Sequence, residues 1–93
     1  MNKTTVQQFK VKKQFIIFED NGTTFQSYDS PICKVFGQMG EQKLILYGDV
    51  WDYSNTTRKY FKAFINEYTP FSYETKQQWL KEIEQNENIE VLK

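Results

Sequence analysis

Apolar and polar residues alternate along the first half of the chain. Between Phe9 and Ile17, apolar residues are separated by Lys and Gln, and this period of two is typical of a strand with one buried face. Asp20-Asn21-Gly22 then supplies residues that favour the tight turn of a hairpin. The pattern predicts a small antiparallel sheet of three to four strands within residues 5–47. Phe9, Phe15 and Ile17 are expected to face its core. The later strands are expected at 23–28, 32–36 and 42–47.

The apolar period changes in the second half of the chain. From Tyr60 to Tyr68, apolar residues recur at the spacing of one buried face of a helix. Ser54 and Asn55 are both favourable N-cap residues, because their side chains accept hydrogen bonds from free backbone N–H groups. A Thr-Pro pair then interrupts the pattern. We therefore expect a first helix at about 55–68.

A second helix is expected at about 73–86. Ser72 precedes it in the position of an N-cap, and an acidic residue follows in the first turn, where the helix dipole favours an anion. Trp79, Leu80 and Ile83 share the spacing of one helix face and are expected to point into the core. This helix completes the regular part of the chain.

The order of these elements predicts the fold class. A small antiparallel sheet followed by two helices packed on one of its faces is an α+β arrangement. A chain of 93 residues has room for one core, so residues 1–93 are expected to form a single domain. The tail at 89–92 either adds a short edge strand or frays.

Charge and hydropathy narrow the possible functions. The chain has twelve basic and twelve acidic residues, so its formal net charge is zero. Proteins that bind nucleic-acid phosphates usually have an excess of Lys and Arg, and DNA mimics need the opposite excess. There is no apolar segment of signal-peptide or membrane-spanning type. We expect a protein of the bacterial cytoplasm with no membrane contact.

The residues that most often carry catalysis are scarce. Histidine is absent, which removes the commonest general base and the Ser-His and Cys-His pairs. Cys33 has no partner thiol and is expected to be buried and inert. Asp49 and Asp52 are expected to cap a turn, because two carboxylates alone do not provide enough oxygen ligands for a hard cation. We expect no enzyme activity, no cofactor and no metal site.

The segment 47–60 is the densest in aromatic, hydroxyl and charged residues, and two interpretations of it remain open. Its hydroxyl side chains surround the expected helix start, where four backbone N–H groups lack partners within the helix. The first interpretation is a well-capped helix anchored by Trp51 and Tyr53. The second is an anion-binding helix N-terminus reinforced by Arg58 and Lys59.

Two short motifs resemble a known small domain. The first is Ser27-Tyr28-x-Ser30-Pro31-Ile32-Cys33, and the second is Trp51-Asp52-Tyr53-Ser54-x-Thr56-Thr57. Together they resemble a domain of proteins from phages and plasmids of low-GC Gram-positive bacteria, which has a Tyr-Ser-x-Thr-Thr helix start. The resemblance covers about residues 25–65. Accessory proteins of this kind include inhibitors of host defence, among them anti-CRISPR proteins.

The resemblance implies a non-enzymatic phage protein that binds and inhibits a host defence protein, such as an RNA-guided CRISPR nuclease. Exposed aromatic side chains are good interface anchors, although packing in the core is an equally simple use for them. The candidate partner-binding residues are Tyr47, Trp51, Tyr53, Arg58, Lys59 and Lys62. The alternative is a nucleic-acid-binding protein. It would use an N-terminal lysine arm, Lys10, Lys12 and Lys13, together with Arg58, Lys59 and Lys62.

Overall fold

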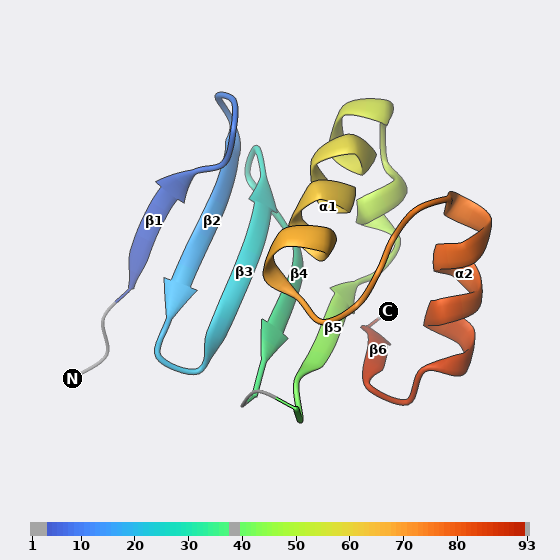
Figure 1. The fold of residues 1–93 in the computed structure, drawn as a ribbon. Coiled ribbons are helices and arrows are strands. Elements are labelled where there is room, and N and C mark those ends of the chain that lie inside the picture. Colours follow the sequence, from blue (N-terminus) through green and yellow to red (C-terminus); the bar gives the residue numbers. More distant parts are fainter. Residues whose placement is uncertain (1–3, 38–39, 93) are drawn as a thin grey trace.

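The structure is a computed structural model and describes residues 4–37 and 40–92. One sheet and two α-helices make up its regular part (Figure 1). The strands are β1 (Thr5–Gln8), β2 (Gln14–Glu19), β3 (Gly22–Ser27), β4 (Ser30–Phe36), β5 (Lys43–Tyr47) and β6 (Ile89–Leu92). The helices are the short 3₁₀ helix η1 (Val50–Asp52), then α1 (Asn55–Tyr68) and α2 (Lys76–Gln85).

The six strands lie in the sheet in their order along the chain. Neighbours from β1 to β5 are antiparallel, whereas β6 pairs with β5 in parallel. The fold is therefore α+β, as predicted, but the prediction of a purely antiparallel sheet with three to four strands was wrong. The sheet is mixed and has six strands.

The two extra strands lie at the edges of the sheet. The segment between Phe9 and Ile17, which was predicted to be one strand, contains a turn that separates β1 from β2. Lys10 and Lys13 both have positive φ in this turn. At the other edge, β6 returns to β5 only after the chain has passed through α1 and α2. Of the two alternatives for residues 89–92, the edge strand is thus the one the structure has, but its parallel pairing was not predicted. A parallel neighbour requires such a long crossover.

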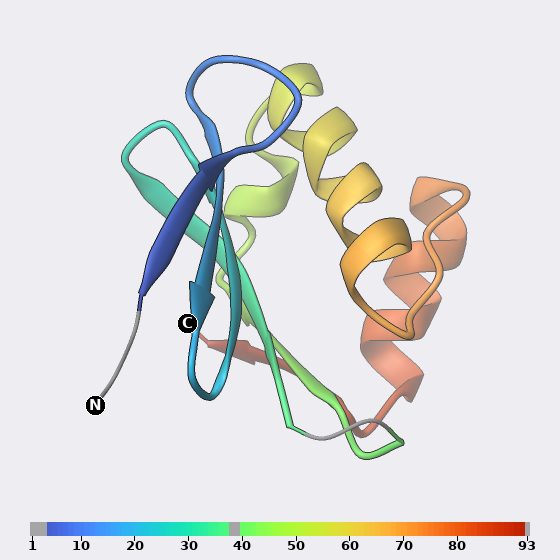
Figure 2. The ribbon, with the colours of Figure 1, turned by 60° about the vertical axis from the view of Figure 1, so that its left-hand side comes forward.

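Both α-helices lie on the same side of the sheet (Figure 2). The predicted bounds of α1 are confirmed, and Ser54 is its N-cap: the Ser54 side chain accepts a hydrogen bond from the backbone N–H of Thr57. The predicted start of α2 was wrong. This helix begins at Lys76, and Thr75 caps it in place of Ser72, because the Thr75 side chain accepts from the backbone N–H of Gln78.

The buried face of the sheet has the opposite phase to the one predicted for β2. Ile16 is buried, while Phe15 and Ile17 are half-buried on the face away from the helices. Phe9 is buried as predicted, but it reaches the core from the turn after β1, where its ring packs edge-on against Phe25 and Tyr68. Because side chains alternate across a strand, a shift of one residue exchanges the two faces.

Aromatic rings fill most of the space between the sheet and the helices. Trp51 stacks on Phe61 with ring centroids 5.5 Å apart, and Tyr73 stacks on Trp79 at 5.4 Å. Leu80, expected in this core, is 46% exposed instead. The aromatic content of the sequence is thus used mainly for packing, which leaves few aromatic side chains at the surface.

Candidate binding groove

The two motifs of the sequence, some twenty residues apart, come together in the structure. The hydroxyl oxygens of Ser27, at the end of β3, and Thr57, in the first turn of α1, are 3.5 Å apart and buried. Beside this contact is a surface cavity of about 440 Å³. We call it the tyrosine groove. It is lined by Ser27, Tyr28, Ser30, Ile32, Val50, Tyr53 and Thr57.

Two exposed aromatic side chains belong to the groove. Tyr53, at the C-cap of η1, is 84% exposed, and Tyr28, in the turn between β3 and β4, is 56% exposed. Tyr28 has φ +55°, in the left-handed region that costs an L-residue free energy. Two hydrogen bonds hold it there: its N–H donates to the carbonyl of Lys13, and its carbonyl accepts from Gln26 Nε2. Lys10 and Lys13 in the β1–β2 turn also have positive φ, so this conformation recurs in the turns of the sheet.

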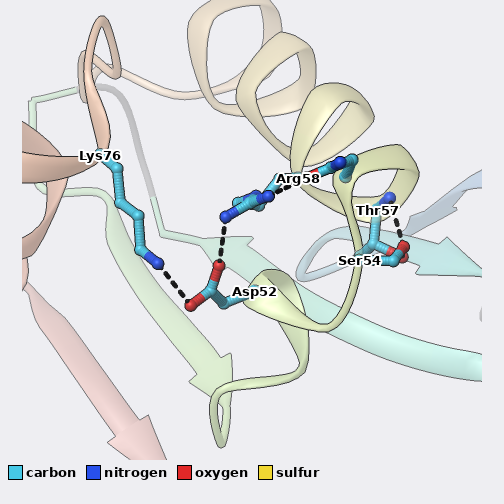
Figure 3. Close-up of polar contacts among 6 residues, drawn as sticks. Asp52, Ser54, Thr57, Arg58 and Lys76 are labelled. Atoms are coloured by element: carbon cyan, nitrogen blue, oxygen red, sulfur yellow. Dashed lines mark hydrogen bonds and ion pairs between the residues drawn. The ribbon is translucent and has the colours of Figure 1, made fainter.

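The groove combines apolar and hydroxyl groups. Ile32 is buried and Val50 is half-buried, so both offer limited apolar surface to an occupant. Ser54 Oγ donates to Thr57 Oγ1 at 3.1 Å and accepts from the backbone N–H of Thr57 at the same distance (Figure 3). Thr57 therefore belongs both to the cap of α1 and to the groove. Capping and binding are compatible roles for this segment.

Arg58 is held by neighbouring side chains. Its Nη1 lies 3.1 Å from Asp52 Oδ1, and its Nη2 donates to Asn55 Oδ1. Lys76 Nζ reaches the second oxygen of the same Asp52 carboxylate at 2.9 Å (Figure 3). The Arg58 guanidinium is thus engaged by side-chain acceptors of the protein, and it shares the Asp52 carboxylate with Lys76. This arrangement gives little support to the anion-binding interpretation of the helix N-terminus.

The six predicted contact residues do not form one surface. Trp51 is buried, and Tyr47 follows the buried Leu46 in β5, so Tyr47 points to the face of the sheet away from the helices. Lys59 is exposed, with its ammonium over the ring of Tyr60. Lys62 Nζ donates to the carbonyl of Glu74 at 2.8 Å. Tyr53 is the predicted residue that lines the groove.

Six of the seven lining residues carry no predicted contact role. Four of them belong to the first of the two motifs, which was the available signal: Ser27, Tyr28, Ser30 and Ile32. A tyrosine in a turn gives no indication from sequence whether its ring is exposed. The pairing of the β3–β4 turn with the start of α1 supplies that information.

Residues 2–84 of the chain match a protein family described as a family of unknown function, DUF8033. The protein is a member of the DUF8033 family. The matched region contains both segments of the tyrosine groove and all of α1, and it ends within α2, before β6. No curated protein and no solved structure matches the chain.

The other features considered in this DUF8033 protein are its single cysteine, possible metal ligands and possible membrane-spanning helices. Cys33 is buried, as expected, and burial raises the pKa of its thiol well above the ordinary value. Across residues 4–37 and 40–92, no group of three His, Cys, Asp or Glu side chains is placed to hold a metal ion. No helix in the same ranges is long and apolar enough to cross a membrane. The tyrosine groove is the candidate site on which the proposals below are built.

Proposed function

We propose that this DUF8033 protein is a non-catalytic binding protein and that the tyrosine groove is its contact surface for a protein partner. The observation that carries the proposal is the exposure of Tyr28 and Tyr53, which line the same cavity as the contact between Ser27 and Thr57. Most other aromatic rings of the chain pack in the core, so these two stand apart from the general pattern. Tyrosine is enriched among residues that dominate binding energy at protein interfaces.

The proposed partner is a host defence protein, such as an RNA-guided CRISPR nuclease, inhibited in the cytoplasm of a bacterial host. This part of the proposal rests on the resemblance to small phage and plasmid proteins. Its structural support is that the two motifs carrying the resemblance also supply most of the groove: Ser27, Tyr28, Ser30 and Ile32 from one, and Tyr53 and Thr57 from the other. Blocking a nuclease by occupying its surface requires affinity and shape but no catalytic group.

The nucleic-acid alternative has weaker support. None of the residues that line the groove is Lys or Arg. Two cations that this alternative would use are engaged in ion pairs, Lys10 with Glu67 at 2.9 Å and Arg58 with Asp52 at 3.1 Å. With zero net charge, the chain lacks the excess of basic residues that phosphate binding usually needs. We therefore expect weak binding of duplex DNA at physiological salt.

Affinity capture followed by reconstitution tests the proposal. The wild-type protein and its Tyr53→Ala variant are used to capture partners from a lysate of Gram-positive cells, and the captured protein is then purified. We expect direct binding to the wild type and a clear loss with Tyr53→Ala. Leu80→Ala is the matched control, because Leu80 is also an exposed apolar side chain but lies on α2. If the partner is a CRISPR nuclease, Tyr53→Ala should also lose inhibition of its target cleavage, and Leu80→Ala should retain it.

Two results would count against the proposal. Equal binding by wild type and Tyr53→Ala would remove the groove as the contact surface. A captured nucleic acid, with affinity that falls steeply as salt rises, would favour the nucleic-acid alternative.

A further inference from the structure

The tyrosine groove has an uncharged lining. None of its seven lining residues is Lys, Arg, His, Asp or Glu. The lining therefore supplies no cation for a phosphate or carboxylate and no anion for a basic side chain. A charged group placed there would lose hydration without gaining an opposite charge. The groove is suited to an uncharged segment of a partner.

Two of the hydroxyl groups that line the groove, those of Ser27 and Thr57, contact each other. Ser54 Oγ donates to Thr57 Oγ1, and a single further hydrogen bond joins Thr57 Oγ1 to Ser27 Oγ. Ser27 and Thr57 carry one hydroxyl proton each, and the bond between them uses one of the two. Within residues 4–37 and 40–92, these two hydroxyl groups make no other side-chain hydrogen bond than the ones named, so one of the two protons is available for an occupant of the groove. An occupant with an uncommitted acceptor would satisfy it.

The uncharged lining and the available hydroxyl proton favour one backbone conformation of a bound peptide over others. Helices and paired strands commit their backbone carbonyls to internal hydrogen bonds, whereas a polyproline II segment leaves its carbonyls open. Proline rings are also uncharged, rigid and apolar, and they dock between aromatic side chains in known recognition grooves. Building on the proposed function, we propose that the tyrosine groove binds an uncharged proline-rich segment of the partner in the polyproline II conformation. Tyr28 and Tyr53 pack against its rings, and the hydroxyl pair of Ser27 and Thr57 donates to one of its carbonyls.

A decaproline peptide is the direct probe. Titrated into the full-length ¹⁵N-labelled protein, it should shift the backbone amide signals of Tyr28, Tyr53 and Thr57 in a saturable way. Tyr53→Ala should weaken binding about tenfold, equivalent to about 1.4 kcal/mol, because it removes an aromatic contact. Tyr53→Phe keeps the ring and should remain within about twofold of wild type. Tyr53 is the best site for this test because its side chain is highly exposed, so its truncation should leave the fold intact.

The hydroxyl donor is tested at Thr57. Thr57→Val removes the hydroxyl at nearly constant shape, and we expect decaproline affinity to fall about fivefold, the ratio for one lost hydrogen bond of about 1 kcal/mol. Thr57→Ser retains the hydroxyl and should restore most of the affinity. Because Thr57 also contacts the cap of α1, a ¹H–¹⁵N spectrum of each variant must first match the folded wild type.

The outcomes separate this inference from the proposed function. No saturable shift at millimolar decaproline, shifts located away from the groove, or tighter binding of a single-stranded oligonucleotide than of decaproline would each overturn the polyproline assignment. If decaproline fails while Tyr53→Ala still abolishes capture of the protein partner, the proposed function stands and its ligand is another kind of segment. If decaproline binds as expected while capture is insensitive to Tyr53, the groove binds polyproline but is not the contact surface of that partner.

Discussion

Arg58 Nη1 and Asp52 Oδ1 are 3.1 Å apart, and the second oxygen of that carboxylate lies 2.9 Å from Lys76 Nζ. One carboxylate at the end of η1 therefore joins the first turn of α1 to the first turn of α2. Arg58 and Asp52 are partly buried, whereas Lys76 is exposed, so solvent screens the pair of Asp52 with Arg58 less than its pair with Lys76. Arg58, which one interpretation of the sequence assigned to an anion-binding helix N-terminus, is in part a connection between helices.

This connection predicts different effects of two adjacent charge reversals. Arg58→Glu removes the pair with Asp52 and places a like charge beside it, so the free energy of unfolding should fall by about 1 kcal/mol. Lys59→Glu should change it by less than about 0.5 kcal/mol, because Lys59 is exposed and contacts the ring of Tyr60. Urea denaturation of the two variants measures both. Equal losses would mean that the Asp52 contacts do not contribute to stability.

The cap of α2 gives a second prediction. Thr75→Ala removes the side-chain oxygen that accepts from the N–H of Gln78 and should cost about 1 kcal/mol. Ser72→Ala is the matched control and should be nearly neutral, because Ser72 is exposed and lies before the helix start. Thermal melts of the two variants compare them directly. A larger loss for Ser72→Ala would restore the helix start expected from the sequence.

The phase of β2 gives a third prediction. Ile16→Ala should cost roughly 2–5 kcal/mol, the range for truncating a fully buried aliphatic side chain. Phe15→Ala removes a larger side chain but from the half-buried outer face, and it should cost less than Ile16→Ala. Denaturant unfolding of the two variants gives the order. The opposite order would support the phase predicted from the alternation of Phe9, Phe15 and Ile17.

The first helix shows what the sequence could predict. The bounds 55–68 and the cap at Ser54 follow from local chemistry: an apolar face with helical spacing and a hydroxyl residue at its start. The α+β class follows from the change of period halfway along the chain. Each of these features is encoded within a few neighbouring residues.

The choice of the buried face of β2 shows what the sequence could not predict. Residues 14–19 contain four consecutive apolar residues, so either face of β2 could be the buried one on pattern alone. The structure decides by pairing Ile16 with Phe25, whose ring stacks on Phe64 of α1. Such a choice depends on partners distant in sequence.

The tyrosine groove was predictable only in part. Tyr53 was a candidate because it lies in the dense segment before α1, and its 84% exposure is consistent with that role. Tyr28 could not be predicted as a candidate, because its exposure follows from the turn between β3 and β4 and from the hydrogen bond of its N–H to the carbonyl of Lys13. Trp51, two residues before Tyr53, is buried. Spacing alone does not distinguish a core anchor from a surface ring.

The backbone of Tyr28 gives the last prediction. Glycine adopts a φ of +55° at little cost in free energy, whereas for a residue with a Cβ this conformation costs about 1 kcal/mol. Tyr28→Gly should therefore be more stable than Tyr28→Ala by about 1 kcal/mol in denaturant unfolding. Both variants lose the aromatic ring, so both should lose the binding assigned to the groove. A higher stability of Tyr28→Gly than of Tyr28→Ala would show that the backbone at this position is strained for a residue with a Cβ.

Tyr53 supplies the control, because its backbone is ordinary. Its φ of −62° and ψ of −41° lie in the right-handed helical region, where glycine is less stable than alanine by about 0.5–1 kcal/mol. Tyr53→Gly should then be less stable than Tyr53→Ala, the reverse of the order at Tyr28, while both Tyr53 variants also lose binding. Four unfolding curves decide the question. The same order at both positions would show that Tyr28 is not strained, and its conformation would then carry no indication of function.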